Sequence, residues 1–168
     1  LLRAELHPSL WAQPSLTRET LDRVSPDHAV MLGNLGSHGA LLNSEALRAW
    51  GVAETVVDPP GGAYGRRGGV LDGRIYENAL WMHARRAATR VPDEHYRDAL
   101  RNFSAQAASL GITSVQTMPL AGAERIQALI DGVGLPIRWR VMDFHFAGEP
   151  IRAGRGPVKI ILDGTPFV

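Results

Sequence analysis

The sequence predicts an α/β fold with a parallel sheet, and two observations support this prediction. The second half of the chain alternates in the order helix, strand, helix, strand, loop, strand. This order is typical of βα units, in which helices join parallel strands. A stretch rich in proline and glycine, residues 58–73, separates this half from an N-terminal part with a different rhythm. The 168 residues suffice for one domain or two small ones.

The N-terminal part is expected to begin as a loop, followed by a short helix that ends before Pro26. Thr17 is a suitable N-cap for this helix, and Glu19 lies in its first turn, where the helix dipole favours an acid. Residues 29–35 are a predicted strand, and residues 43–51 contain a second predicted helix.

Residues 58–73 are expected to form a loop, because glycine and proline are the strongest breakers of regular structure. Predicted helices follow at residues 76–90, 94–110 and 123–130, and predicted strands at residues 112–118, 137–144 and 158–162. In the second of these helices Leu100, Phe103, Ala107 and Leu110 recur at helical spacing and fall on one face.

Polar side chains follow the predicted parallel strands at their carboxyl ends, where such sheets carry functional groups. These are Gln116, Asp143, His145 and Asp163. Either aspartate could be a general base or a metal ligand. Asp163 also begins an Asp-Gly pair, which is an ordinary turn, and the turn is the preferred interpretation. His145 is either a metal or substrate contact or a histidine at the edge of the core.

Lys159 lies inside the last predicted strand and is the only lysine among 18 basic residues. A buried lysine can lose its proton and become a nucleophile, a base or a carbamate, which arginine cannot. In a closed barrel an inward-pointing lysine would be buried, and it would then be neutral, paired or modified. The alternative is a lysine whose stem merely covers apolar surface.

His38 stands among small residues in the segment 36–40, which would allow a ligand to approach closely. A loop histidine bonded to the backbone is the alternative. The six histidines form neither an H-x-H nor an H-E-x-x-H pattern, and there is no cysteine. The sequence therefore contains no local metal-binding motif.

The formal net charge of +1 gives no field that would favour nucleic acid. No apolar run reaches the roughly 20 residues that span a membrane. There is no signal-peptide pattern, and we expect a cytoplasmic protein, although the lack of cysteine is compatible with other compartments. Open edges of a small sheet would favour pairing with a second chain, so a homo-oligomer is possible.

Six short segments occur in an order that covers most of the chain: Leu16–Asp22, Val24–His28, Gly36–Ser44, Asp58–Gly62, Leu110–Gln116 and Val158–Gly164. Together they resemble the amidohydrolase superfamily, in particular its third family, which includes N-substituted formamide deformylases.

The resemblance implies a (β/α)8 TIM barrel that binds one or two divalent metal ions, usually zinc, and hydrolyses C–N bonds of a small amide-like substrate with a metal-activated water. It implies that Lys159 is carboxylated and bridges the metals, so that it is both catalytic residue and metal ligand. It also suggests that His38 reaches the substrate from an inserted subdomain, while Gln116 and His145 line the substrate pocket.

The chain departs from the family pattern in several places. The H-x-H pair, the later metal histidines and the catalytic aspartate of the family are absent, and Ser37 stands where the family usually has aspartate. We therefore expect a partial barrel of about three strands in residues 91–168, with an inserted α+β subdomain in residues 1–90. Such a segment of a metal-dependent amidohydrolase should be inactive in isolation. The alternative is a non-catalytic α+β binding or assembly module.

Overall fold

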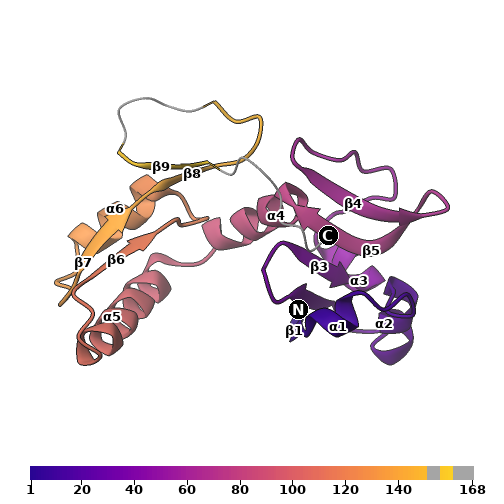
Figure 1. Ribbon diagram of the computed structural model, residues 1–168, viewed down its shortest axis with the longest axis horizontal. Coiled ribbons are helices and arrows are strands. Elements are labelled where there is room, and N and C mark those ends of the chain that lie inside the picture. Colours follow the sequence, from indigo (N-terminus) through magenta and orange to yellow (C-terminus); the bar gives the residue numbers. More distant parts are fainter. Residues whose placement is uncertain (151–155, 161–168) are drawn as a thin grey trace. The chain divides into compact units, whose positions relative to one another are not determined.

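The computed structural model describes residues 1–150 and 156–160. These residues form two compact units, Leu1–His83 and residues 84–160 (Figure 1). Both units combine strands with helices, which confirms the predicted α/β class.

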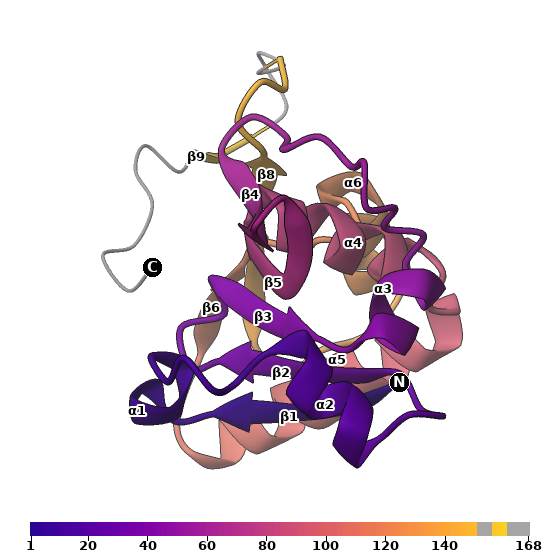
Figure 2. The same cartoon turned by 90° about the vertical axis from the view of Figure 1, so that its right-hand side faces the viewer.

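The first unit is built on a five-stranded sheet with the order β1-β2-β3-β5-β4. β1 pairs parallel to β2, whereas the other neighbours are antiparallel; Figure 2 shows β1, β2 and β3 side by side. Its elements are β1 (Leu2–Leu6), α1 (Pro8–Trp11), α2 (Arg18–Val24), β2 (Val30–Asn34), β3 (Gly39–Leu42), α3 (Ser44–Ala49), β4 (Gly62–Arg67) and β5 (Val70–Glu77). Helix α4 (Asn78–Thr89) begins in this unit and ends in the second.

Side-chain caps explain where α2 and α3 begin, and the cap of α2 is the one that the sequence predicts. The Thr17 hydroxyl accepts a hydrogen bond from the amide of Thr20 at the start of α2. The buried Asn43 caps α3, and its Oδ1 also accepts from the amide of Val30, 2.9 Å away. One amide side chain therefore holds the start of α3 against the start of β2. Leu42 of β3 and Ile75 of β5 are fully buried in the core of this unit.

The predicted loop over residues 58–73 is wrong, because most of it belongs to the β4–β5 hairpin. Gly68 and Gly69 have φ values of 61° and 86°, and a two-residue turn with positive φ at both positions matches the twist of paired strands. In the sequence, glycines in a hairpin turn therefore give the same signal as glycines in a loop. The predicted N-terminal loop is also wrong, since it contains β1, an edge strand with almost entirely exposed side chains.

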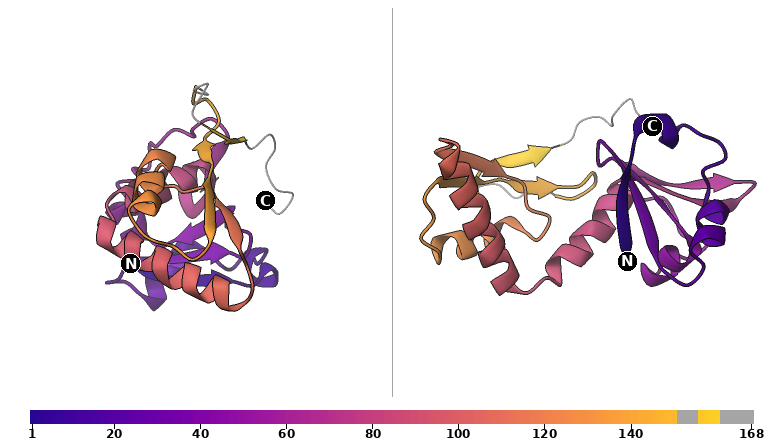
Figure 3. Two further views of the ribbon diagram at one scale, coloured as in Figure 1. Left: turned by 90° about the vertical axis from the view of Figure 1, so that its left-hand side faces the viewer. Right: turned by 90° about the horizontal axis from the view of Figure 1, so that it is seen from below.

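The second unit contains two parallel strand pairs, which confirms that its strands run in the same direction (Figure 3). Its elements are α5 (Asp93–Ser109), β6 (Ser114–Thr117), α6 (Ala123–Asp131), β7 (Arg138–Val141), β8 (Asp143–His145) and β9 (Val158–Ile160). β6 pairs with β7, and β8 pairs with β9. The single strand predicted for residues 137–144 is therefore two strands, separated at Met142.

The β6–β7 pair and the β8–β9 pair adjoin at Met142 and Asp143. The Met142 amide donates to the carbonyl of Thr117 at the end of β6, 2.9 Å away, and the Asp143 amide donates to the carbonyl of Pro157, also 2.9 Å away. Successive amides of a strand point to opposite sides. The β7–β8 segment therefore has β6 as its neighbour on one side and β9 on the other, in chain order.

Helices α5 and α6 bury only part of the predicted apolar faces. Leu100 of α5 lies in a core cluster with Ile126 and Leu129 of α6, and Ala107 of α5 is also buried. Phe103 and Leu110 are 49% and 72% exposed, so the apolar face of α5 is only partly covered.

The buried side of α5 is completed by a polar residue instead. Ser104 is fully buried, and its hydroxyl accepts a hydrogen bond from the indole of Trp139 at 3.0 Å. This bond ties α5 to β7, and apolar periodicity cannot reveal it.

Substitution of Gly73 in β5 tests how closely the first unit is packed around this strand. A Cβ there would stand 2.3 Å from the carbonyl oxygen of Leu42, and its φ is +90°. We expect Gly73→Ala to lower the free energy of unfolding by roughly twice the ~1–2 kcal/mol expected for Gly51→Ala. Gly51 also has positive φ, but has open space at its Cβ. Urea unfolding followed by tryptophan fluorescence measures both, and equal losses would contradict the packing argument.

Candidate functional site

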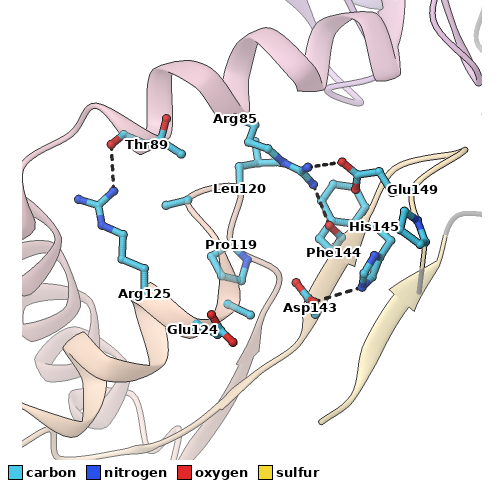
Figure 4. Close-up of a pocket in the computed structure, with 14 residues that line it drawn as sticks. Arg85, Thr89, Pro119, Leu120, Glu124, Arg125, Asp143, Phe144, His145 and Glu149 are labelled. Carbon is cyan, nitrogen blue, oxygen red and sulfur yellow. Dashed lines mark hydrogen bonds and ion pairs between the residues drawn. The ribbon is translucent and has the colours of Figure 1, made fainter. Parts of the chain in front are cut away.

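A hollow of about 490 Å³ lies in the second unit, beyond the carboxyl ends of β6 and β8 (Figure 4). Its walls come from α4, the segment that joins β6 to α6, the first turn of α6, β8 and the turn after it. The labelled side chains are Arg85, Thr89, Pro119, Leu120, Glu124, Arg125, Asp143, Phe144, His145 and Glu149. Parallel sheets carry their functional groups at this position.

Asp143 and His145 form a pair on one face of β8, because residues two apart on a strand point to the same side. The His145 Nε2 atom lies 3.1 Å from the Asp143 Oδ2 atom, and the two side chains are 11% and 30% exposed. Nε2 is itself buried, and within the described residues it makes no hydrogen bond of proper geometry. Such a carboxylate–imidazole pair can exchange a proton or donate two ligand atoms to a cation.

Arg85 of α4 clamps the turn that follows β8. Its guanidinium lies 2.6 Å from a carboxylate oxygen of Glu149, donates to the Phe144 carbonyl at 2.8 Å, and stacks 3.7 Å from the ring centre of Phe146. Burial would raise the pKa of Glu149, but hydrogen bonds from the Phe146 amide and from Arg85 outweigh it and hold the pKa below its usual range. The positive charge of Arg85 is therefore paired within the wall.

Arg125, near the start of α6, is also engaged by the protein. It donates to the carboxylate of Asp93 at 2.6 and 2.9 Å and to the carbonyls of Val91 and Thr89 at 2.6 and 3.2 Å. It thereby joins α6 to the link between α4 and α5. Both arginines at the hollow thus serve to shape it.

The predicted site residues occupy three places. His145 on β8 and Lys159 on β9 are brought onto neighbouring strands, where Phe144 pairs with Lys159 and His145 with Ile160. Gln116 is exposed on β6 and lines a separate hollow with Trp139 and Arg140. His38 belongs to the first unit, where it contacts Glu77. Asp163 lies outside the described residues.

The structure corrects the expectation that Lys159 is buried. Its side chain is exposed, because β9 pairs with β8 alone among the described strands. The register also places Lys159 on the same face as Phe144, and Asp143 and His145 on the opposite face.

Sequence reasoning misses Arg85, Glu149, Arg125 and Glu77 as parts of these sites. The partners of these residues lie 32 to 64 positions away in the chain, so no local spacing reveals them. Arg85 stands out in the sequence only as half of an Arg-Arg pair.

The described residues do not by themselves fit a complete metal centre. Across residues 1–150 and 156–160, no group of three or more histidine, aspartate or glutamate side chains is close enough to hold a metal ion. The Asp143–His145 pair supplies two donors at most, whereas a protein-bound zinc ion usually has three or four protein ligands.

The chain belongs to the amidohydrolase family, whose family model matches residues 5–166. Among solved structures, an uncharacterized metal-dependent hydrolase from Pyrococcus horikoshii OT3 is 19% identical, with a TM-score of 0.50 over 84% of this chain and 27% of that one. A second such hydrolase, from Pyrococcus furiosus, is 21% identical, with a TM-score of 0.47 over 84% of this chain and 28% of that one.

The likeness to the Pyrococcus horikoshii protein shows a shared fold, and this chain spans only about a quarter of that protein's length. The search of curated proteins finds no match. Among the helices that the structure describes, none has the length and apolar character needed to cross a membrane.

The Arg85–Glu149 pair predicts how acid affects the second unit. Because the folded pKa of Glu149 lies below its ordinary 4.5, its contribution to stability is complete above that value and is lost as pH falls through the folded pKa. We expect Glu149→Gln to lower stability near pH 7 and to flatten the loss of stability as the pH falls below 4.5.

Urea midpoints over this pH range measure the effect, with Glu94→Gln, an exposed position on α5, as the matched control. If the urea midpoints of Glu149→Gln and Glu94→Gln show the same pH dependence, the Arg85–Glu149 pair does not contribute to stability as described.

Proposed function

We propose that the chain is part of a metal-dependent amidohydrolase that hydrolyses C–N bonds of small amide-like substrates. The observation that carries this proposal is the family match over residues 5–166, and the N-substituted formamide deformylase branch is the proposed subfamily. The hollow at the strand ends supports it, because its place in the fold and its size of about 490 Å³ suit a small-molecule substrate.

The second unit is proposed to be a segment of a (β/α)8 barrel. The support is topological: β6, the β7–β8 segment and β9 run parallel and follow one another in space in the order of the chain. Closed βα barrels place successive strands side by side in this way. The first unit is then the inserted subdomain.

The described residues have proposed roles in proton transfer and in shaping the hollow, neither of which needs a complete metal centre. Asp143 and His145 hold or move a proton at the wall of the hollow, and Arg85 and Arg125 fix the positions of that wall. A divalent ion, with zinc as the proposed metal, would be bound largely by side chains beyond the described set.

Lys159 is proposed as the one metal ligand that this chain contributes, as a carbamate. It is the sole lysine, and it lies in the middle of β9, the neighbour of β8, with its side chain on the face opposite to Asp143 and His145. Its exposure within the described residues leaves the amine accessible to carbon dioxide and to further parts of a barrel. Gln116 and His38 are proposed as substrate contacts.

The test uses the full-length protein that carries this chain. We expect Lys159→Ala to lose bound zinc, measured by inductively coupled plasma mass spectrometry. The same change should lower kcat/KM for amide hydrolysis by more than about 100-fold. Loss of a group that only supports a metal ligand typically costs about 10- to 100-fold, so loss of a ligand itself should cost more. Lys159→Arg should behave the same, because a guanidinium keeps the charge but cannot form a carbamate.

Gln106→Ala, at an exposed position on α5, is the matched control and should change neither quantity. Full metal content and full activity in Lys159→Ala would remove the lysine from the mechanism. A wild-type protein that binds no zinc and hydrolyses no amide in a broad panel would favour the non-catalytic module instead.

A further inference from the structure

Strand β1 lies at one edge of the five-stranded sheet, and among the described strands its single neighbour is β2 (Figure 2). The pairing with β2 is parallel and runs without a break over all five residues of β1. Every side chain of β1 except that of Leu6 is exposed. The outer edge of β1 therefore presents backbone groups that can pair with a further strand.

The opposite edge of the same sheet is protected against such pairing. In β4 the register shifts between Tyr64 and Arg66, and an irregularity of this kind disfavours a further strand. The Tyr64 amide donates to the Asp58 carboxylate at 2.9 Å, and the Arg66 guanidinium donates to the carbonyls of Tyr64 and Val56. The register of β1, in contrast, is continuous, and its sequence contains no proline.

The backbone groups on the outer edge of β1 belong to Arg3 and Glu5. The Leu2 amide donates to the carbonyl of Ala29, directly before β2, at 2.7 Å, and so points toward β2. Successive residues of a strand direct their backbone groups to opposite sides, so those of Arg3 and Glu5 point away from β2. An antiparallel neighbour can bond to these two residues only through residues that also point outward.

The side chains of β1 are complementary to those of a second, antiparallel copy. Arg3 and Glu5 lie on one face of the strand, whereas Leu2, Ala4 and Leu6 lie on the other. Within the described residues, Arg3 and Glu5 are exposed and neither forms an ion pair. When Ala4 faces the partner's Ala4, Arg3 lies opposite the partner's Glu5, and Leu2 lies opposite the partner's Leu6. Each of these two pairs occurs twice, because the arrangement is two-fold symmetric.

Neighbouring registers lack this match. A shift by one residue would bring outward-pointing backbone groups opposite inward-pointing ones, which cannot bond. A shift by two residues would place either Arg3 opposite the partner's Arg3 or Glu5 opposite the partner's Glu5, and like charges directly opposite each other are destabilising. In the matched register the charged residues form the hydrogen-bonded pairs, and the leucines form pairs of the closer, non-hydrogen-bonded kind.

We propose that two copies of this chain associate through β1, which joins their sheets into one continuous sheet across a two-fold axis at Ala4. Charged side chains normally protect an edge strand from pairing, but here the charges of a second copy attract each other. That complementarity makes a second copy the occupant of the edge. A single strand pair buries little surface, so the dimer is weak and depends on concentration.

Sedimentation equilibrium of the 168-residue chain measures this association at total concentrations from about 10 µM to about 1 mM. We expect the weight-average mass to rise with concentration from that of one chain toward that of two. Arg3→Glu places like charges opposite each other twice and should weaken the dimer by about tenfold or more, as should Glu5→Arg. The variant with both changes restores two pairs of opposite charge and should recover the wild-type association. Arg86→Glu, at an exposed position on α4, is the matched control and should change nothing.

Cross-linking tests the register itself, because the chain has no cysteine. Ala4→Cys should form an interchain disulfide under mild oxidation, since the two Cα atoms of a non-hydrogen-bonded pair lie about 4.5 Å apart. Val57→Cys, at a position 83% exposed in the same unit, is the control and should remain largely reduced.

Two further cysteine variants distinguish the matched register from its neighbours. Arg3→Cys and Glu5→Cys chains should each stay reduced alone, because the same residue of two copies is about 7 to 8 Å apart, beyond the range of a disulfide. Mixed together they should cross-link with each other, since the mixed dimer brings the two cysteines opposite each other and keeps one Arg3–Glu5 pair. The mass of the intact cross-linked product identifies the mixed dimer.

The proposal is overturned if the wild-type chain stays monomeric up to about 1 mM, which would leave the edge to a strand of a different protein. It is equally overturned if the double charge variant has a native circular dichroism spectrum but associates as weakly as the single variants. Equal oxidation of Ala4→Cys and Val57→Cys would place the contact on another surface and also overturn it. None of these outcomes bears on metal binding or amide hydrolysis, so they are distinct from a failure of the proposed function.

Discussion

Two consecutive backbone amides, those of Met142 and Asp143, determine the arrangement of the second unit. One bonds to the end of β6, and the other bonds to Pro157, just before β9. The bonds make a single extended segment the shared neighbour of two parallel strands. They also bring the strand of Lys159 beside the strand of His145, on which the functional proposal depends.

Charge pairing at the carboxyl ends of the strands reduces the unpaired positive charge in the walls of the hollow. Arg85 and Arg125 would make it strongly basic, but Glu149, Asp93 and several backbone carbonyls engage them. The titratable pair Asp143 and His145 therefore lies in a wall whose arginines are already paired. Such a wall leaves little unpaired positive charge for capturing an anion.

The sequence predicted well those features that depend on neighbours within one helical turn. The cap at Thr17 and the start of a helix near Asn43 follow from local residue types, and the parallel direction of the later strands follows from the order of the elements. The β4–β5 hairpin was missed because Gly68-Gly69 signals a break in either a loop or a turn. The exposure of Phe103 was not predictable, because periodicity shows which face of a helix is apolar and cannot show how much of that face is covered.

The candidate sites were predictable only in part, for the same physical reason. His38, His145 and Lys159 stand out by residue type and position in the sequence. The carboxylate that orients His38 is 39 residues away, and the pairing of β3 with β5 brings it there. The exposure of Lys159 likewise depends on which strands lie beside β9, and that is a property of the fold as a whole.

The most direct test of the shared central strand is a cross-link, which the absence of native cysteine makes simple to interpret. Phe144 and Lys159 are direct partners in the parallel register, so their Cα atoms should lie about 4.8 Å apart, within the range of a disulfide. We expect Phe144→Cys with Lys159→Cys to form a disulfide under mild oxidation, and Phe144→Cys with Val158→Cys, whose side chains point to opposite faces, to remain reduced. Equal oxidation of both pairs, or oxidation of the second pair alone, would contradict the arrangement described here.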